Sequence, residues 1–209
     1  MKAADLPTYY NICEILEHNL EHRGDKIALL SENGSFTFRE VSEQVNRVGN
    51  ALIRSGVQFG ECVAILCPDR PEWVSVFFAT AKIGGVALGL NTLLKTDEYD
   101  YILKDARVKV LVVHDSLKAL VEPIIKKHDT LIKVITVTDN KSIKCTTFTD
   151  WIDGEKSELN SATTHREDFC SLHYSSGTTG VPKGVLHMHK DYPLIAQLSG
   201  VDLFGIAEN

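Results

Sequence analysis

The sequence predicts an α/β protein built on a largely parallel sheet with helices on its faces. Short runs that are apolar throughout, such as residues 62–67 and 108–113, alternate with segments whose apolar residues repeat at helical spacing. Runs of the first kind are typical of strands covered on both faces. Strand–helix–strand alternation implies parallel pairing through right-handed crossovers. Apolar residues make up 44% of the 209 positions and charged residues 24%, which favours a folded domain over a disordered chain.

The first half of the chain predicts helices with recognisable ends. Near the N-terminus, Ile12, Ile15 and Leu16 form the apolar side of a short helix, and the opposite side is expected to be solvated: Glu14, Glu17, His18, Glu21 and His22. A second helix spans residues 39–55, because Val41, Val45, Val48 and Leu52 share one face, and Gly56 can end it in the left-handed conformation. Pro71 favours the start of a third helix that runs towards Gly84.

The second half continues the alternation. Thr96 is expected to cap a helix, with acidic residues in its first turn. A further helix is expected over residues 117–127, and the more polar residues 139–168 predict a surface excursion around a short helix at 148–152. The strands expected in this half lie at 86–90, 108–113, 132–137 and 170–174.

Residues 174–184, Tyr-Ser-Ser-Gly-Thr-Thr-Gly-Val-Pro-Lys-Gly, have the composition of a phosphate-binding loop. Gly177 and Gly180 allow positive φ and close approach of an anion, while hydroxyls and backbone N–H groups supply donors. Lys183 adds a positive charge, and Pro182 stiffens the end of the loop. The spacing does not fit the Walker A pattern, because no Gly-Lys-Ser/Thr occurs. A β-like run follows the loop directly, so the loop is expected to join two strands as a hairpin. The alternative is an ordinary surface loop rich in Ser, Gly and Thr.

Other candidate sites are weaker. His187 and His189 would share one face of a strand, and a His-x-His pair can bind a metal. No third ligand lies nearby at a recognisable spacing, so we expect no metal site and assign both rings to packing or hydrogen bonding. Cys62 and Cys67 are expected to be core thiols and not a redox pair.

Composition restricts the partners and the compartment. The net charge of -6 and the scattered lysines provide no basic stripe for nucleic acid. The longest apolar stretch, residues 73–90, contains Lys82 and is therefore a poor membrane span. The N-terminus carries no apolar signal, and the five cysteines form an odd set without a Cys-x-x-Cys motif. These features predict reduced thiols and a cytoplasmic location.

The loop at residues 175–184 resembles the signature Thr/Ser-Ser-Gly-Thr-Thr-Gly-x-Pro-Lys-Gly of the AMP-forming adenylating enzymes, and it matches that signature throughout. This family comprises acyl- and aryl-CoA ligases, adenylation domains of peptide synthetases and beetle luciferases. Upstream, Gly34–Glu40 is similar to the family's opening hairpin and helix start, and Gly60–Leu66 to its first core strand. Residues Ala81–Asn91 resemble its Lys-x-Gly-x-x-x-x-x-x-Asn segment, so the resemblance covers essentially the whole chain.

The resemblance implies that residues 1–209 form part of the large N-terminal domain of an adenylate-forming enzyme. Members of this family are more than twice as long. Their adenine-binding segment, ribose-binding aspartate, hinge and C-terminal domain with its catalytic lysine have no counterpart in this sequence. We therefore expect the C-terminal domain to be absent, residues 1–209 to be inactive alone, and an exposed apolar face to cause self-association into a homo-oligomer.

The implied reaction is adenylation followed by thioesterification. A small aryl or acyl carboxylate attacks the α-phosphorus of Mg-ATP, pyrophosphate leaves, and coenzyme A captures the acyl-adenylate. Lys183 is the expected catalytic residue, and the β,γ-phosphate contacts are expected at Ser175, Ser176, Gly177, Thr178, Thr179, Gly180 and Lys183. Residues 185–189 and 204–209 look most like the benzoate-type aryl-CoA ligases, although short-chain acyl-CoA synthetases share much of this pattern. The alternative is a non-catalytic, truncated relative that acts as a structural or weak polyphosphate-binding module.

Overall fold

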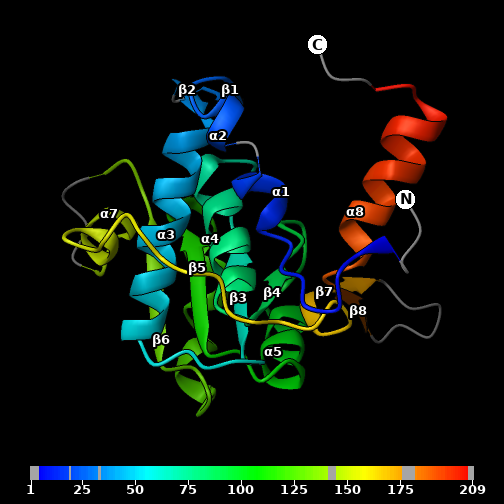
Figure 1. Ribbon diagram of the computed structural model, residues 1–209. Helices are drawn as coiled ribbons and strands as arrows, with labels where there is room; N and C mark the ends of the chain where they lie inside the picture. The colour runs from blue at the N-terminus through cyan, green and yellow to red at the C-terminus, as the bar shows by residue number, and fades with distance from the viewer. Residues whose placement is uncertain (1–4, 19, 33, 141–144, 176–181, 207–209) are drawn as a thin grey trace.

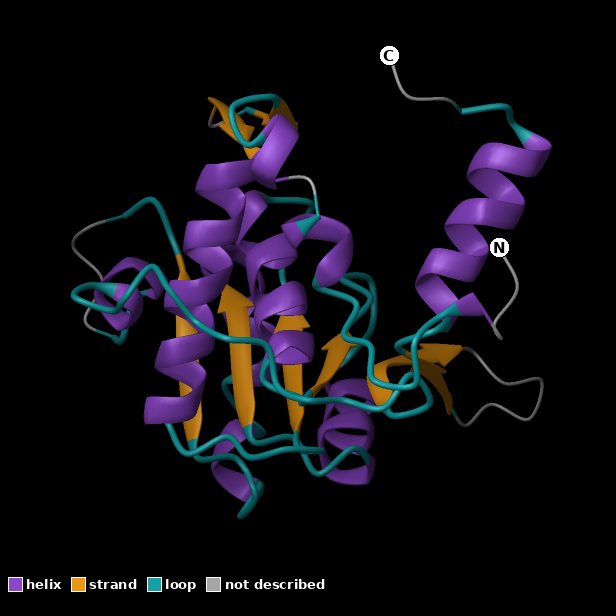
Figure 2. Cartoon of the chain, in the orientation of Figure 1, coloured by secondary structure: helices purple, strands orange, loops and turns teal. Residues whose placement is uncertain are grey.

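A six-stranded sheet forms the centre of the computed structural model, which describes residues 5–18, 20–32, 34–140, 145–175 and 182–206 (Figures 1 and 2). The strand order is β6-β5-β3-β4-β7-β8, and every neighbouring pair is parallel except β7 and β8, which are antiparallel. Strands β1 and β2 form a separate antiparallel hairpin. The predicted α/β fold with a largely parallel sheet is thus confirmed.

The elements follow the predicted alternation. The strands are β1 (Ile27–Ser31), β2 (Gly34–Thr37), β3 (Cys62–Leu66), β4 (Val86–Gly89), β5 (Val110–His114), β6 (Lys133–Val137), β7 (Phe169–Ser175) and β8 (Lys183–Met188). The α-helices are α1 (Glu14–Glu17), α2 (Leu20–Arg23), α3 (Phe38–Arg54), α4 (Pro71–Lys82), α5 (Thr96–Asp105), α6 (Lys118–Val121), α7 (Phe148–Ile152) and α8 (Asp191–Ile195). Two 3-10 turns, η2 (Asp115–Leu117) and η3 (Ile125–Lys127), flank α6, and a π-helical stretch, η4 (Ala196–Leu203), continues α8.

Helices cover both faces of the sheet, and the side chains of β3 alternate between them. Val63 and Ile65 pack in the cluster beneath α3 and α4, whereas Cys62, Ala64 and Leu66 pack in the cluster beneath α5 and α6. All five residues of β3 are buried. This two-sided burial explains why the strand is apolar throughout and does not alternate with polar residues.

The helix ends follow from local residue chemistry. The Thr37 hydroxyl accepts a hydrogen bond from the Glu40 N–H at 3.2 Å, and the Glu40 carboxylate accepts one from the Thr37 N–H at 2.8 Å, which completes a capping box at the start of α3. Gly56 follows that helix with a φ of 91°, as predicted. Pro71 is the first residue of α4, also as predicted.

Two local predictions are wrong. Thr96 is the first residue of α5 and not its cap, because the Lys95 N–H bonds the Glu98 carboxylate at 2.9 Å and Lys95 takes the capping position. The helix expected over residues 117–127 is broken into η2, α6 and η3. Pro123 accounts for the break, since proline has no N–H to donate and its ring clashes with the carbonyl four residues earlier.

Lys82 is a buried cation that ties several segments together. Its side chain is 2% exposed, and its ammonium lies 2.5 Å from the Glu17 carboxylate and 2.6 Å from the Asn46 amide oxygen. The Lys82 carbonyl accepts a hydrogen bond from the N–H of Ala162, which lies in the segment between α7 and β7. Buried charges need such partners. The expectation that Glu17 belongs to a solvated helix face is therefore wrong.

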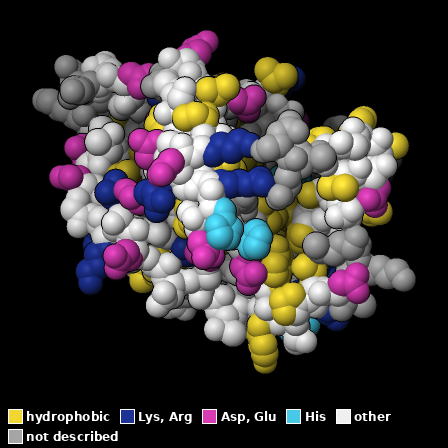
Figure 3. All heavy atoms as spheres, turned by 45° about the horizontal axis from the view of Figure 1, so that its top comes forward, with side chains coloured by type: hydrophobic (Ala, Val, Ile, Leu, Met, Phe, Trp, Pro, Cys, Tyr) yellow, Lys and Arg dark blue, Asp and Glu magenta, His cyan; other side chains and the backbone are white. Residues whose placement is uncertain are grey.

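The C-terminal helical segment, α8 with η4, stands away from the main body (Figure 1). It carries large exposed apolar side chains, namely Ile195, Leu198, Val201 and Leu203, followed by Phe204 and Ile206. Figure 3 shows apolar side chains gathered on this side of the molecule. Within the described ranges, no helix has both the length and the apolar character needed to cross a membrane.

Candidate functional site

The predicted phosphate loop joins β7 to β8, which pair as an antiparallel hairpin, so the hairpin prediction is confirmed. Ser175 ends β7, Lys183 begins β8, and the two residues lie opposite each other in the register. Both are exposed. The other predicted contacts, Ser176, Gly177, Thr178, Thr179 and Gly180, lie outside the described residues. Of the predicted site, the structure therefore places one hydroxyl and one cation at the two sides of the loop.

The end of β7 and the start of β8 lie at the carboxyl edge of the parallel strands, where α/β proteins usually bind ligands. A small hollow opens there beneath the end of β7. It is lined by the end of β4, the following turn, the first turns of α5 and both sides of the loop: Gly89, Leu90, Asn91, Leu94, Glu98, Ile102, Tyr174, Ser175 and Pro182. Sequence reasoning did not identify this hollow, because its walls come from segments far apart in the chain.

The two faces of the hairpin differ in chemistry. Because side chains alternate along a strand, Lys183, Val185 and His187 share one face of β8, and Ser171, His173 and Ser175 lie on the same face of β7. This face looks towards α4, because the His173 ring lies 3.9 Å from the position that a Cβ on Gly89 would take, and Trp73 of α4 borders the same position. It also looks towards α8, because the Ser171 hydroxyl contacts Tyr192 of that helix. The opposite face carries Leu172 and Tyr174, which pack against the cluster beneath α5.

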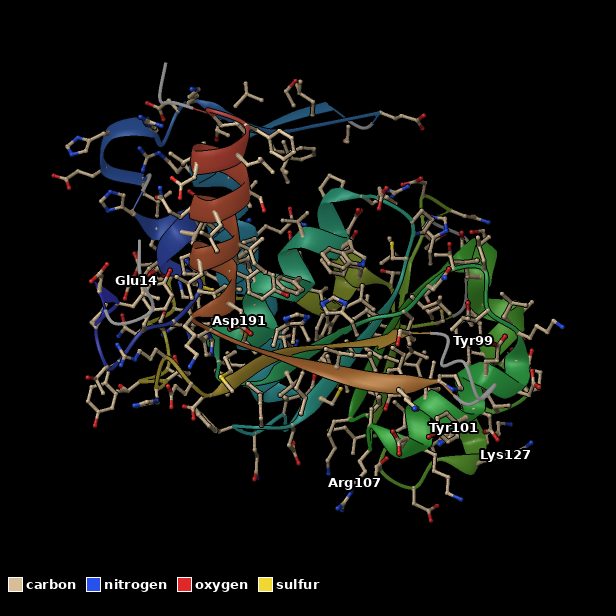
Figure 4. The ribbon with its side chains drawn as sticks, turned by 90° about the vertical axis from the view of Figure 1, so that its right-hand side faces the viewer. Glu14, Tyr99, Tyr101, Arg107, Lys127 and Asp191 are labelled. Carbon is tan, nitrogen blue, oxygen red and sulfur yellow. The ribbon has the colours of Figure 1, made fainter. Side chains whose placement is uncertain are left out.

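A polar cluster occupies the Lys183 face below the loop. The Tyr192 hydroxyl lies 2.6 Å from the Ser171 hydroxyl and 3.4 Å from His173 Nε2. The rings of His173 and His187 meet edge to face, with centroids 5.5 Å apart. His187 Nδ1 lies 3.6 Å from the carboxylate of Asp191, which begins α8 (Figure 4). Sequence reasoning had singled out His187 alone from this cluster.

Burial shifts the pKa values of His173 and Tyr192 within this cluster. It lowers the pKa of His173, and the neighbouring His187 lowers it further. Burial likewise raises the pKa of Tyr192. His173 and Tyr192 are therefore uncharged near neutral pH, so they contribute hydrogen bonds to this face and Lys183 contributes positive charge. His173 lies two residues before Ser175, and no sequence pattern distinguishes such a residue from an ordinary strand histidine.

The two histidines of the His-x-His pair occupy different environments. His187 lies in β8, but His189 follows the end of the strand and is fully buried. His189 Nδ1 accepts a hydrogen bond from the Ile12 N–H at 3.0 Å. The expectation that the rings share one strand face is therefore wrong, whereas the expected packing and hydrogen-bonding roles are confirmed. Across the part of the chain that the structure describes, no group of three or more His, Cys, Asp or Glu residues is placed to hold a metal.

The five cysteines are free thiols, and Cys13, Cys62, Cys67 and Cys170 are buried. Burial raises the pKa of Cys62, Cys67 and Cys170 to about 12 in each case. Such thiols stay protonated and unreactive near neutral pH. The prediction that Cys62 and Cys67 are core thiols is confirmed.

Comparison with known sequences gives a consistent set of relatives. The AMP-binding enzyme family matches residues 16–207. A benzoate–CoA ligase of Thauera aromatica is 32% identical over 99% of this chain and 39% of its own length. A 4-hydroxybenzoate–CoA/benzoate–CoA ligase of Rhodopseudomonas palustris is 30% identical over 93% of this chain and 36% of its own length. The chain thus spans well under half the length of these relatives.

Solved structures share the fold. The anthranilate CoA ligase AuaEII, crystallised in complex with anthranoyl-AMP, is 50% identical and superposes with a TM-score of 0.95, covering 98% of this chain and 40% of that one. A benzoate CoA ligase from Burkholderia xenovorans LB400 is 25% identical, with a TM-score of 0.85 over 96% of this chain and 39% of that one.

Proposed function

The chain belongs to the family of AMP-binding enzymes, and from this membership we propose that it carries the ATP-phosphate site of a carboxylate–CoA ligase. The reaction joins an acid to coenzyme A through an acyl-adenylate, with release of AMP and pyrophosphate. The observation that carries the proposal is the position of Lys183. Its exposed side chain lies opposite Ser175 at the base of the loop, on the carboxyl edge of the sheet.

The chemical role proposed for Lys183 is charge neutralisation. When a carboxylate attacks the α-phosphorus of ATP, negative charge develops on the departing pyrophosphate. A preorganised cation and hydroxyl at the loop stabilise that charge in the transition state. We assign this role to Lys183 and Ser175 at the two sides of the loop, and also to Ser176, Gly177, Thr178, Thr179 and Gly180. Magnesium enters as part of the substrate Mg-ATP, and coenzyme A is the second substrate.

An aryl carboxylate is the substrate class that the relatives favour. Two of the relatives described above are named as benzoate-type ligases, and AuaEII is named as an anthranilate ligase. We therefore propose benzoate, hydroxybenzoates and anthranilate as the acids to compare, with a short-chain fatty acid as the contrast. The buried, protonated thiols fit a reducing compartment, and we propose the cytoplasm as the location.

The test is the substitution Lys183→Ala in the full-length protein, with the two half-reactions measured separately. Carboxylate-dependent exchange of pyrophosphate into ATP should slow by roughly 10²–10³-fold, the scale seen when one preorganised donor to developing charge is lost. Thioesterification of a supplied acyl-adenylate should change much less, because pyrophosphate has left before that step. Lys156→Ala is the matched control, since Lys156 is an exposed lysine whose backbone carbonyl bonds Asn50 of α3 and not the hairpin, and it should leave both steps unchanged.

Equal losses in both half-reactions, or a change below about twofold in pyrophosphate exchange, would contradict the role given to Lys183. Wild-type protein that binds polyphosphate but catalyses no exchange with any acid would support the non-catalytic alternative instead.

A further inference from the structure

Tyr174 lies on the face of the hairpin opposite Lys183. Its ring packs against the cluster beneath α5, and its hydroxyl donates a hydrogen bond of 2.5 Å to the carboxylate of Asp105, the last residue of that helix. Figure 4 shows the hairpin passing close to α5, the helix that carries Tyr99 and Tyr101. The bond joins residues 69 positions apart, and a phenol–carboxylate contact of this length belongs to the strong, charge-assisted class.

Gly184 lies directly across the hairpin from Tyr174. A Cβ added at Gly184 would come within 2.9 Å of Leu172 Cδ1 and 3.3 Å of Tyr174 Cζ. The φ of Gly184 is not positive, so its backbone conformation does not demand a glycine. A side chain at the residue that follows Lys183 would therefore meet Leu172 and the Tyr174 ring, and both would have to shift to make room.

The position of Asp105 is unfavourable for the helix itself. A carboxylate in the last turn faces the negative end of the helix dipole, an arrangement that destabilises helices. The hydrogen bond from Tyr174 offsets this effect, and it also raises the pKa of the Tyr174 hydroxyl, after the larger effect of burial. The hydrogen bond to the hairpin, and not the stability of the helix, thus explains the acidic residue at this position.

We propose that Tyr174, Asp105 and Gly184 form a latch that fixes the β7–β8 hairpin against α5 and thereby positions Ser175 and Lys183. Ser175 follows Tyr174 directly and Lys183 precedes Gly184 directly, so holding the ring and the glycine in register holds the two sides of the loop. The latch contacts the face of the hairpin that packs against α5, and it does not cover the face that carries Lys183. Tyr174 is a positioning residue, and this role rests on the proposed adenylation function.

The test uses Tyr174→Phe, which keeps the ring and removes the hydroxyl, Asp105→Ala, and the double variant, all in the full-length protein. Each single substitution should slow pyrophosphate exchange about tenfold, and the double variant should lose no more than either single one, because both remove the same bond. Thioesterification of a supplied acyl-adenylate should be unchanged. Asp105→Asn keeps an acceptor oxygen and should recover part of the rate. Tyr101→Phe removes an exposed hydroxyl from the same helix and serves as the control.

A second readout separates the latch from the function. Backbone hydrogen exchange at Lys183 and Val185 should be about tenfold faster in Tyr174→Phe than in Tyr101→Phe. Unchanged hydrogen exchange, or rate losses that add in the double variant, would overturn the latch even if wild-type exchange activity is robust. Absence of pyrophosphate exchange in the wild type would instead overturn the proposed function, and faster hydrogen exchange would still support the latch.

Discussion

Replacing His189 with asparagine should remove an acid-sensitive contribution to folding. The His189 ring is fully buried, and Nδ1 accepts the Ile12 N–H, so the ring is neutral with its proton on Nε2. Nε2 has no hydrogen-bond partner among the described residues. Burial lowers the pKa of His189 from 6.5 to about 4, against the smaller opposing effect of the Asp168 carboxylate. A charged imidazolium is therefore disfavoured in the folded state.

The sign and size of the effect follow from the two pKa values. The native pKa lies below the unfolded one, so between about pH 6.5 and pH 4 the unfolded chain binds more protons and stability falls as the pH falls. For a single group with these values, the free energy of unfolding drops by about 2 kcal/mol between pH 7 and pH 5. Above pH 7 the contribution is constant.

Urea unfolding at pH 7 and pH 5 measures this effect in wild type and in His189→Asn. Asparagine retains an acceptor for the Ile12 N–H but does not titrate, so the loss between the two pH values should be smaller than in wild type by about 2 kcal/mol. His22→Asn removes an exposed histidine and should leave the wild-type difference unchanged. An equal loss in wild type and His189→Asn would refute the reasoning.

Two further predictions concern packing. Lys82→Met should lower the free energy of unfolding by about 3 kcal/mol, because it leaves the Glu17 carboxylate and the Asn46 amide oxygen without their buried cation, and adding Glu17→Gln should restore part of the loss. Urea unfolding of the single and double variants checks this, and a loss below about 1 kcal/mol would count against the buried pair. Residues 1–209 should self-associate through the C-terminal helical segment, where Leu198 is 60% exposed and Phe204 72%. Light scattering should show assemblies that Leu198→Glu weakens, whereas a monodisperse monomer at high concentration would contradict the prediction.

The sequence by itself determined the elements whose signals are local. The Thr37–Glu40 capping box, Gly56 after α3 and Pro71 at the start of α4 are each set by residues within one helical turn. The apolar run of β3 identified a strand buried on both faces, and the pattern at 174–184 indicated a hairpin because a β-like run follows it directly. A local signal also explains why the prediction of one helix over residues 117–127 is wrong. The spacing of apolar residues favoured a single helix there, but Pro123 interrupts it.

Only the tertiary structure decided which side chains meet. The strand order β6-β5-β3-β4-β7-β8 brings Asp105 to Tyr174 and forms the hollow beneath the loop. Local sequence predicts neither the contact nor the hollow, because the residues that form them lie far apart in the chain. The same reason explains why Glu17 was expected to be solvated, since its partner Lys82 is 65 residues away. Periodicity reports which face of an element is apolar, whereas the partner of a polar side chain depends on how the elements pack.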